Sequence, residues 1–179
     1  MPDLLAHYAI SYLIASRVVK PKYALVIAIA GILPDIDALL RVHRWITHSL
    51  VLVIIVLLVL VLFSKLTTIN RHTYHVILLS ILLYALHIVL DIFTGSTPIL
   101  WPLTMSSYVI TMNICGTVGE AMIDVKPEVT IISTPNNFTQ QQVLQGPIVT
   151  DMGVIIAIGV TVTIFLEQLE NLKLRFKHH

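Results

Sequence analysis

Residues 50–63 read LVLVIIVLLVLVLF, an unbroken run of Leu, Val, Ile and Phe. Extended from His48 to Leu66, the run reaches about 19 residues, and a helix needs roughly 20 to cross the hydrocarbon core of a bilayer. An apolar run of this length, with its one fixed charge at Lys65 near the end, predicts a transmembrane helix. We therefore expect a membrane to organise the fold.

Four further apolar stretches surround this run, at residues 4–19, 23–40, 74–93 and 152–172. Hydrophobic residues make up 56% of the chain and charged residues only 12%, about half of the roughly 25% typical of a soluble domain. These features predict an all-α integral membrane helical bundle of about five transmembrane helices. With 179 residues, we expect one membrane domain over residues 1–179.

The long polar connection at residues 96–151 interrupts this helical pattern. Within it, residues 108–114, 121–125 and 129–133 show β-type alternation or β-branched runs, separated by Gly and Pro. This pattern predicts a small, strand-rich, external insertion between the fourth and fifth helices, placed like a lid over the helix ends.

The basic residues give an orientation. If all five segments cross, eight of the eleven Lys and Arg fall on one side: Arg17, Lys20, Lys22, Lys65, Arg71, Lys173, Arg175 and Lys177. The other three are Arg41, Arg44 and Lys126. Because cytoplasmic loops carry an excess of Lys and Arg, we expect a cell-membrane protein with a cytoplasmic C-terminus and an external N-terminus.

Composition also limits partners and ligands. The net charge of +1 gives no basic face for a nucleic acid, so membrane lipid is the expected partner. The single Cys115 forms no internal disulfide and no Cys-based zinc motif. Any metal must therefore be held by nitrogen and oxygen ligands.

Seven metal-capable side chains fall at the predicted external helix ends: His7, Asp35, Asp37, His43, His48, His87 and Asp91. Acids and imidazoles are costly in apolar helices, so each needs a partner or a function. Two other histidines, His72 and His75, fall at the opposite end of the fourth segment. The convergence of the seven predicts a metal site that faces water at the external membrane surface.

His87 and Asp91 are four residues apart in one helical run, so both project from the same face. Together they offer a neutral imidazole and a carboxylate, which suits zinc or a similar ion. The alternative is a helix-end Asp with a hydrogen-bonded His above it.

Asp35 and Asp37 follow Pro34. In an unbroken α-helix, residues two apart diverge by about 200°, but an irregular turn at the proline could aim both carboxylates inward. The alternative is that Asp35 caps a turn and Asp37 pairs with Arg41, four residues on.

The segment before the longest apolar run reads His43-Arg44-Trp45-Ile46-Thr47-His48-Ser49. A helix N-terminus disfavours a protonated imidazole, so we expect a neutral His48, as ligation requires, with Thr47 or Ser49 as the cap. His43 suits an interfacial or substrate-contacting role as well as ligation. Arg44 suits an anion clamp, for example for phosphate, or an interfacial snorkelling arginine.

These pieces carry a family resemblance. The matching residues are His7, Leu33-Pro34-Asp35-Ile36-Asp37, His43-Arg44, Thr47-His48-Ser49, and His87-x3-Asp91 followed by Thr94, Gly95 and Pro102. Over roughly residues 5–105, the chain resembles the membrane-bound metal-dependent hydrolases of the YdjM type. That group is distantly similar to the zinc-dependent phospholipase C and single-strand nuclease superfamily.

The resemblance implies a ligand set. One of Asp35 or Asp37 would bind a first ion together with His48, His87 and Asp91, and Asp91 would share a second ion with His7. The further histidines of a three-zinc centre are missing, because none occurs between His87 and the terminal pair. The implied cofactor is therefore a divalent metal, zinc by analogy, as one or two ions.

We therefore expect metal-dependent hydrolysis of a phosphoester in a lipid or lipid-like substrate, by a metal-activated water. Arg44 would clamp the phosphate, and whichever of Asp35 and Asp37 is not a ligand would orient or deprotonate the water. Two alternatives are a metal-ion or proton transporter and a structural membrane protein stapled by metal. Transporter sites typically lie near the bilayer midplane, and the His-Glu-x-x-His motif of metalloproteases is absent.

Overall fold

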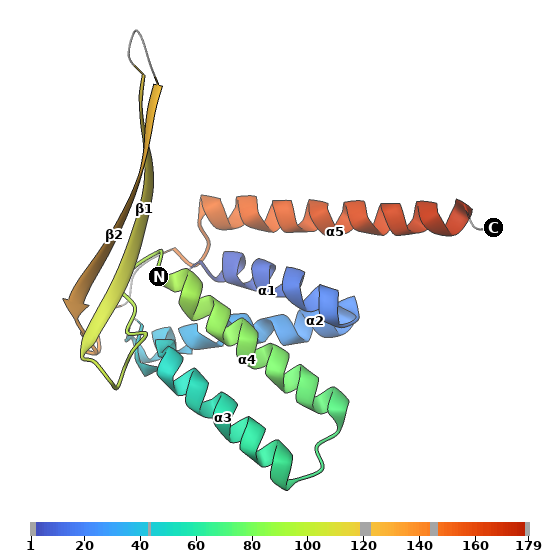
Figure 1. Ribbon diagram of the computed structural model, residues 1–179, viewed down its shortest axis with the longest axis horizontal. Helices are drawn as coiled ribbons and strands as arrows, with labels where there is room; N and C mark the ends of the chain where they lie inside the picture. Colours follow the sequence, from blue (N-terminus) through green and yellow to red (C-terminus); the bar gives the residue numbers. More distant parts are fainter. Residues whose placement is uncertain (1–2, 43, 119–122, 144–146, 178–179) are drawn as a thin grey trace. The chain divides into compact units, whose positions relative to one another are not determined.

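The computed structural model describes residues 3–42, 44–118, 123–143 and 147–177. The fold is mostly helical, with one two-stranded sheet (Figure 1). The elements in chain order are α1 (Leu4–Val18), α2 (Pro21–Ile27), the 3₁₀ segments η1 (Ala28–Leu40) and η2 (Ile46–His48), α3 (Leu50–Leu66), α4 (Arg71–Asp91), β1 (Ser106–Val118), β2 (Ile123–Pro135) and α5 (Asp151–Lys177).

The chain divides into two compact units, each built from separate parts of the sequence. The first unit contains Met1–Leu33, Ile69–Tyr84 and Gln145–His179. The second contains Pro34–Thr68 and Ala85–Leu144.

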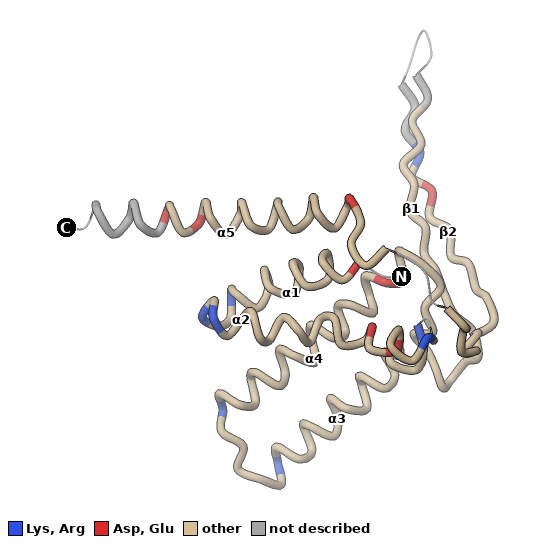
Figure 2. Tube along the Cα trace, turned by 180° about the vertical axis from the view of Figure 1, so that it is seen from behind, with Lys and Arg blue, Asp and Glu red and all other residues tan. Residues whose placement is uncertain are grey.

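Three described helices are long and apolar enough to cross a membrane: Pro21–Leu40, Arg71–Asp91 and Asp151–Glu170. The prediction of about five spans is therefore corrected to three clear candidates, because α1 and α3 have only 15 and 17 residues. At 1.5 Å per residue, α3 extends about 26 Å, less than the roughly 30 Å of a hydrocarbon core. Figure 2 shows that the charged residues lie near the ends of these helices and that the middles carry none.

The long apolar run forms α3, but the helix does not include His48. The backbone N–H of Leu52 donates to Ser49 Oγ at 3.3 Å, so Ser49 is the N-cap. The preceding residues form a separate 3₁₀ turn, Ile46–His48. This turn places His48 outside the apolar helix, at its beginning.

Small residues bring the helices of the first unit close together. Its core contains Ala15, Ala24, Ile27, Ala30, Leu79 and Leu83. A Cβ atom added to Gly31 would lie 1.8 Å from Ser11 Oγ, so this contact requires glycine. Close approach at small residues is a common way for helices to pack in membranes, where the lipid gives no hydrophobic drive to association.

Asp3 joins the beginnings of two helices in the first unit. Its Oδ1 accepts from the N–H of Ala6 at 3.0 Å, and its Oδ2 accepts from the N–H of Thr150 at 2.9 Å. Burial raises the pKa of this carboxyl, but the hydrogen bonds from Thr150 and Ala6 bring the pKa below its ordinary value. Asp3 therefore caps α1 in its ionised form and holds the chain just before α5.

The strand-rich insertion is one antiparallel hairpin in the second unit, with register from Ser106↔Pro135 to Val118↔Ile123. The predicted strand at residues 108–114 lies in β1. The prediction of separate strands at 121–125 and 129–133 is wrong, because β2 runs continuously from Ile123 and residues 121 and 122 lie outside the described residues. Pro127 pairs with Ile114 without ending the strand, since both strands of a two-stranded sheet have a free edge that tolerates proline.

The base of the hairpin is bonded to the chain that follows α4. The N–H of Ile110 donates to the carbonyl of Ile92 at 2.8 Å. Thr97 and Tyr108 exchange two backbone hydrogen bonds of 2.9 Å each. Within the second unit, the hairpin is therefore fixed one residue beyond Asp91.

Candidate metal centre

Asp35 and Asp37 lie in η1, directly after Pro34. With about three residues per turn, side chains two apart point about 120° from each other. In an α-helix the rotation of about 200° leaves them about 160° apart. The narrower angle allows the two buried carboxylates to contact opposite nitrogens of the same ring. His48 Nε2 lies 3.4 Å from Asp35 Oδ1, and His48 Nδ1 lies 3.0 Å from Asp37 Oδ2.

The two residues that follow His48 hold it in place. The hydroxyl of Ser49 donates to the carbonyl of Trp101, and the N–H of Leu50 donates to the carbonyl of Ile99 at 3.0 Å. These bonds attach the start of α3 to the loop that follows α4. The His48 side chain is fully buried as a result.

His87 and Asp91 lie on the same face of α4, as their spacing predicts. His87 Nε2 is 3.7 Å from Asp91 Oδ2. Both side chains are buried, at 1% and 0% exposure. The last turns of α4 therefore supply one imidazole and one carboxylate to the same point.

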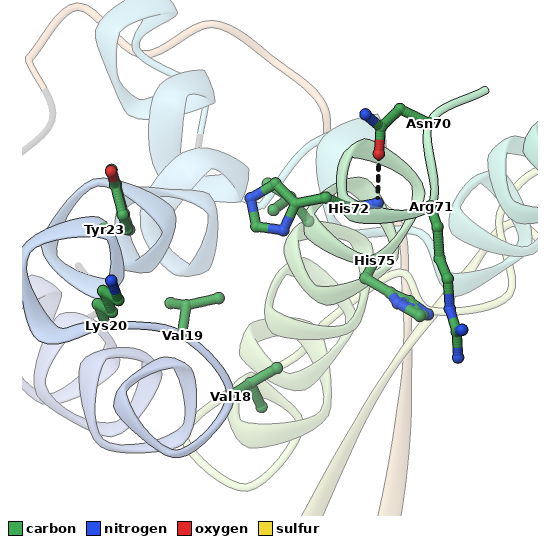
Figure 3. Close-up of a pocket in the computed structure, with 9 residues that line it drawn as sticks. Val18, Val19, Lys20, Tyr23, Asn70, Arg71, His72 and His75 are labelled. Atoms are coloured by element: carbon green, nitrogen blue, oxygen red, sulfur yellow. Dashed lines mark hydrogen bonds between the residues drawn. The ribbon is translucent and has the colours of Figure 1, made fainter.

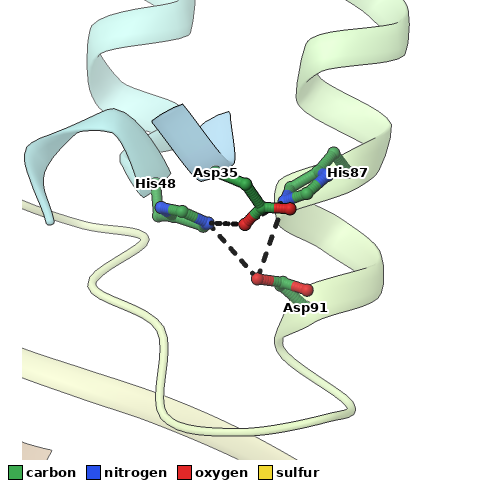
Figure 4. A group of neighbouring side chains, drawn as sticks. All are labelled: Asp35, His48, His87 and Asp91. Atoms are coloured by element: carbon green, nitrogen blue, oxygen red, sulfur yellow. Dashed lines mark ion pairs between the residues drawn. The ribbon is translucent and has the colours of Figure 1, made fainter. Parts of the chain in front are cut away.

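Two carboxylates and two imidazoles meet in this way within the second unit (Figure 4). Each imidazole Nε2 lies near Asp35 Oδ1 and Asp91 Oδ2; the distances are 3.4 and 3.3 Å for His48, and 3.4 and 3.7 Å for His87. All four donor atoms lie within 4.8 Å of one another. With metal–ligand bonds of about 2.0–2.2 Å, the donors of a tetrahedral site stand about 3.3–3.6 Å apart.

The hydrogen-bond geometry also fits a metal ion. In the described chain, His48 Nε2 and Asp35 Oδ2 are buried and have no hydrogen-bond partner of suitable geometry. Buried polar atoms of this kind are rare and need an explanation, such as an ion. Asp35, His48, His87 and Asp91 could therefore hold a divalent ion through two nitrogens and two oxygens.

Asp37 is not one of the four donors. Its Oδ2 accepts from the N–H of Trp45 at 2.6 Å and from the hydroxyl of Thr47 at 2.9 Å, beside His48 Nδ1. A carboxylate on the far nitrogen of a ligating histidine fixes the orientation of the ring. The alternatives left open by the sequence are thus distinguished: Asp35 faces the donor cluster, and Asp37 supports His48 from behind.

The surroundings of His48 shift its pKa. Burial alone would lower the pKa of His48, but contacts with Asp35, Asp37 and Asp91 raise it to about 10. This shift is opposite to the one that the helix dipole predicts, because three carboxylates lie next to the ring. A divalent cation could take the place of the proton among these carboxylates.

Arg44 contacts the cluster directly. Its Nε lies 3.1 Å from Asp91 Oδ2, and its Nη2 donates to Thr94 Oγ1 at 2.6 Å. A Cβ atom added to Gly95 would lie 2.3 Å from Nη1, so glycine makes room for the guanidinium. Arg44 is 6% exposed and has a φ of 52°. Its burial is inconsistent with the snorkelling alternative.

A polar pocket of about 210 Å³ adjoins this arginine in the second unit. Besides Arg44 and Pro135, its lining carries hydroxyl or amide groups: Ser96, Ser107, Thr134, Asn137, Thr139 and Gln141. No sequence pattern predicted a pocket from these residues, because Ser, Thr, Asn and Gln residues separated along a loop carry no spacing that is typical of a binding site. The pairing of the hairpin strands brings them together.

Two predicted site residues are not placed relative to the donors. His7 is buried in α1, which belongs to the first unit, so its role as ligand of a second ion stays a prediction. His43 lies outside the described residues.

Apolar helices long enough to cross a membrane, with a buried set of metal-capable side chains at their ends, define a membrane protein with a possible metal centre. Residues 4–166 match the YdjM inner membrane protein family, and the chain belongs to this family. Comparisons with curated proteins and with solved structures gave no match.

Proposed function

We propose that the protein is an integral membrane metal-dependent hydrolase that cleaves phosphoester bonds of lipids or lipid-like substrates at the outer membrane face. The observation that supports this proposal is the buried cluster of Asp35, His48, His87 and Asp91 in contact with Arg44. A cation site beside a buried guanidinium is a setting for an anionic group. The outer location and the distant similarity to zinc-dependent phospholipases C stay predictions.

The four donors would hold the ion, which is zinc by analogy with nitrogen and oxygen sites of this kind. When bound, a divalent ion supplies Lewis-acid chemistry: it polarises a phosphoryl oxygen and lowers the pKa of water. The chain itself supplies the positions of the donors. Asp37 fixes the ring of His48, and Asp91 is fixed by Arg44.

Arg44 would orient the substrate. Its guanidinium contacts Asp91 on one side and lines the polar pocket on the other. A planar guanidinium binds two oxygens of a phosphate at once. A phosphate held there would lie between the donor cluster and the pocket.

The polar pocket would receive the part of the substrate beyond the phosphate. Apart from Arg44, its lining residues are uncharged. Hydroxyl and amide side chains bind neutral groups that both donate and accept hydrogen bonds. We therefore propose a headgroup that carries hydroxyls, such as glycerol, rather than a cationic amine.

Replacement of Asp37 by Asn tests its supporting role. We expect metal affinity to fall by about 10- to 100-fold, because outer partners of ligating histidines typically contribute this much. Thr47→Val, which removes one donor to the Asp37 carboxylate, should have a smaller effect. Both are measured by competition with a chelating metal indicator. Unchanged metal affinity with lost turnover would instead make Asp37 the base that deprotonates the water.

Removal of the metal tests the proposed activity. The purified protein is analysed for metals, stripped with a chelator, and assayed on phosphatidylglycerol and on a soluble phosphodiester. We expect hydrolysis to disappear with the ion and to return when the same ion is added back, because the donors alone supply no Lewis acid. Full turnover by the metal-stripped protein would contradict the proposal.

A further inference from the structure

A second cavity, of about 780 Å³, lies wholly within the first unit, between the α1–α2 corner and the first turns of α4. Figure 3 shows His72 projecting from α4 toward Val19 and Tyr23, with Lys20 on the facing segment. The volume falls within the range of about 300–1,000 Å³ that is typical of ligand sites. The cavity is large enough for a headgroup with the first carbons of its chains.

Both charged residues among the described residues that line this cavity are basic. Lys20 and Arg71 carry fixed positive charges, and no carboxylate occurs among the described residues that line the cavity. His72 and His75 add imidazole nitrogens to the same rim. The adjacent Lys22 lies with its ammonium 5.0 Å from the Tyr23 ring, which adds a further cation. The local field therefore favours an anion.

The remaining wall is apolar. Val18, Val19 and Val76 line the cavity together with the ring of Tyr23. Val18 is 62% exposed, so its side chain is available for contact. A basic rim above an apolar wall matches a molecule with a phosphate joined to hydrocarbon, and a free inorganic anion would leave the valines without a partner.

The cavity lies where two candidate spans begin. Lys20 directly precedes Pro21–Leu40, and Arg71 is the first residue of Arg71–Asp91. Phospholipid headgroups lie at this level of a bilayer, and basic pockets between membrane helices bind them. The cavity is lined by residues of the first unit and the metal donors belong to the second, so the two sites share no residue.

We propose that this cavity binds an anionic membrane phospholipid, with the phosphate at its basic rim and the first acyl carbons on the valines. The bound lipid joins the α1–α2 corner to the start of α4. This site does not depend on the proposed hydrolase activity.

The test measures lipid binding to the full-length protein by native mass spectrometry and by thermal unfolding. The probes are short-chain phosphatidylglycerol, phosphatidylcholine with the same chains, and inorganic phosphate, and the protein is stripped of metal beforehand so that the lipid is not hydrolysed. We expect phosphatidylglycerol to bind and to raise the unfolding temperature more than phosphatidylcholine does. Lys20→Gln combined with Arg71→Gln should weaken phosphatidylglycerol binding about 30-fold, since each basic residue near an anionic surface contributes about a factor of five or more.

Two control variants make the result specific. Lys65→Gln removes an exposed charge at the end of α3 that does not line the cavity, and it should leave binding unchanged. Lys20→Arg combined with Arg71→Lys keeps both charges and should retain binding, which excludes a general folding defect. Equal losses in the Lys65 variant, equal binding of phosphatidylcholine, or equally tight binding of inorganic phosphate at Lys20 and Arg71 would overturn the proposal.

Discussion

Asp91→Ala is expected to abolish metal retention and to reduce metal-dependent turnover by on the order of a thousandfold or more. Asp91 Oδ2 lies close to both imidazoles, at 3.3 and 3.7 Å, so its removal leaves each Nε2 with one carboxylate neighbour, Asp35, in place of two. Asp35 occupies the matching position, at 3.4 Å from each ring. We therefore expect Asp35→Ala and His48→Ala to give the same result, measured by elemental analysis and by headgroup release.

Matched controls exist outside the cluster. Asp151, in the first turn of α5, and His75, near the start of α4, are exposed. Asp151→Ala and His75→Ala should keep the metal at full occupancy. Normal metal content and activity in Asp91→Ala would contradict the assignment of the donors.

The same series distinguishes the rival functions. A metal staple predicts that loss of the ion lowers the unfolding temperature, while the unmodified protein hydrolyses no substrate at all. A transporter predicts metal or proton flux into liposomes that disappears in Asp91→Ala. The hydrolase proposal requires headgroup release by the unmodified protein, and the two rivals do not.

Arg44→Ala is expected to reduce turnover by about 100- to 1,000-fold, the range found when one donor to a developing anion is removed, while the metal is retained. The guanidinium contacts Asp91 from outside the four donors, so its loss removes the phosphate clamp and leaves the ligand set complete. Arg44→Lys should recover only part of the activity, because lysine keeps the charge without the planar pair of donors. Turnover and metal content are measured on the same preparations.

Gly95→Ala tests the position of the guanidinium without removing its charge. The added Cβ would lie 2.3 Å from Nη1, so the Arg44 side chain must move away from Thr94. We expect turnover to fall with normal metal content and folding.

If Arg44→Ala loses its metal together with its stability, Arg44 has only a structural role as a partner of Asp91.

The sequence was sufficient to predict the apolar helices and the relative position of two of the four donors, His87 and Asp91. Long apolar runs predicted α3, α4 and α5 because burial of apolar surface in lipid requires no distant partner. The spacing of His87 and Asp91 placed both on one face of α4, where their atoms lie 3.7 Å apart. A helical period is a local property, so four residues of separation fix this geometry without knowledge of the rest of the chain.

Span lengths were less predictable than span positions. The apolar run suggested a span that begins at His48. The helix begins instead at Leu50, because Ser49 is its N-cap and His48 belongs to the preceding 3₁₀ turn. Hydropathy averages over side chains and does not register a capping hydrogen bond. The sequence also did not predict that β2 is continuous through Pro127. Proline ends a strand only where the neighbouring strand needs a backbone N–H as donor, and the sequence does not show which edge of the strand is free.

The sequence by itself determined that this is an apolar, helical membrane protein with nitrogen and oxygen donors at its helix ends. Only the tertiary structure decided that Asp35 faces the donor cluster while Asp37 supports His48, that Arg44 is buried against Asp91, and that hairpin residues form the adjoining pocket. Apolar runs and helical periods depend on neighbouring residues. The choice between two aspartates depends on the contacts of a non-helical turn with α4, which lies some fifty residues away in the chain.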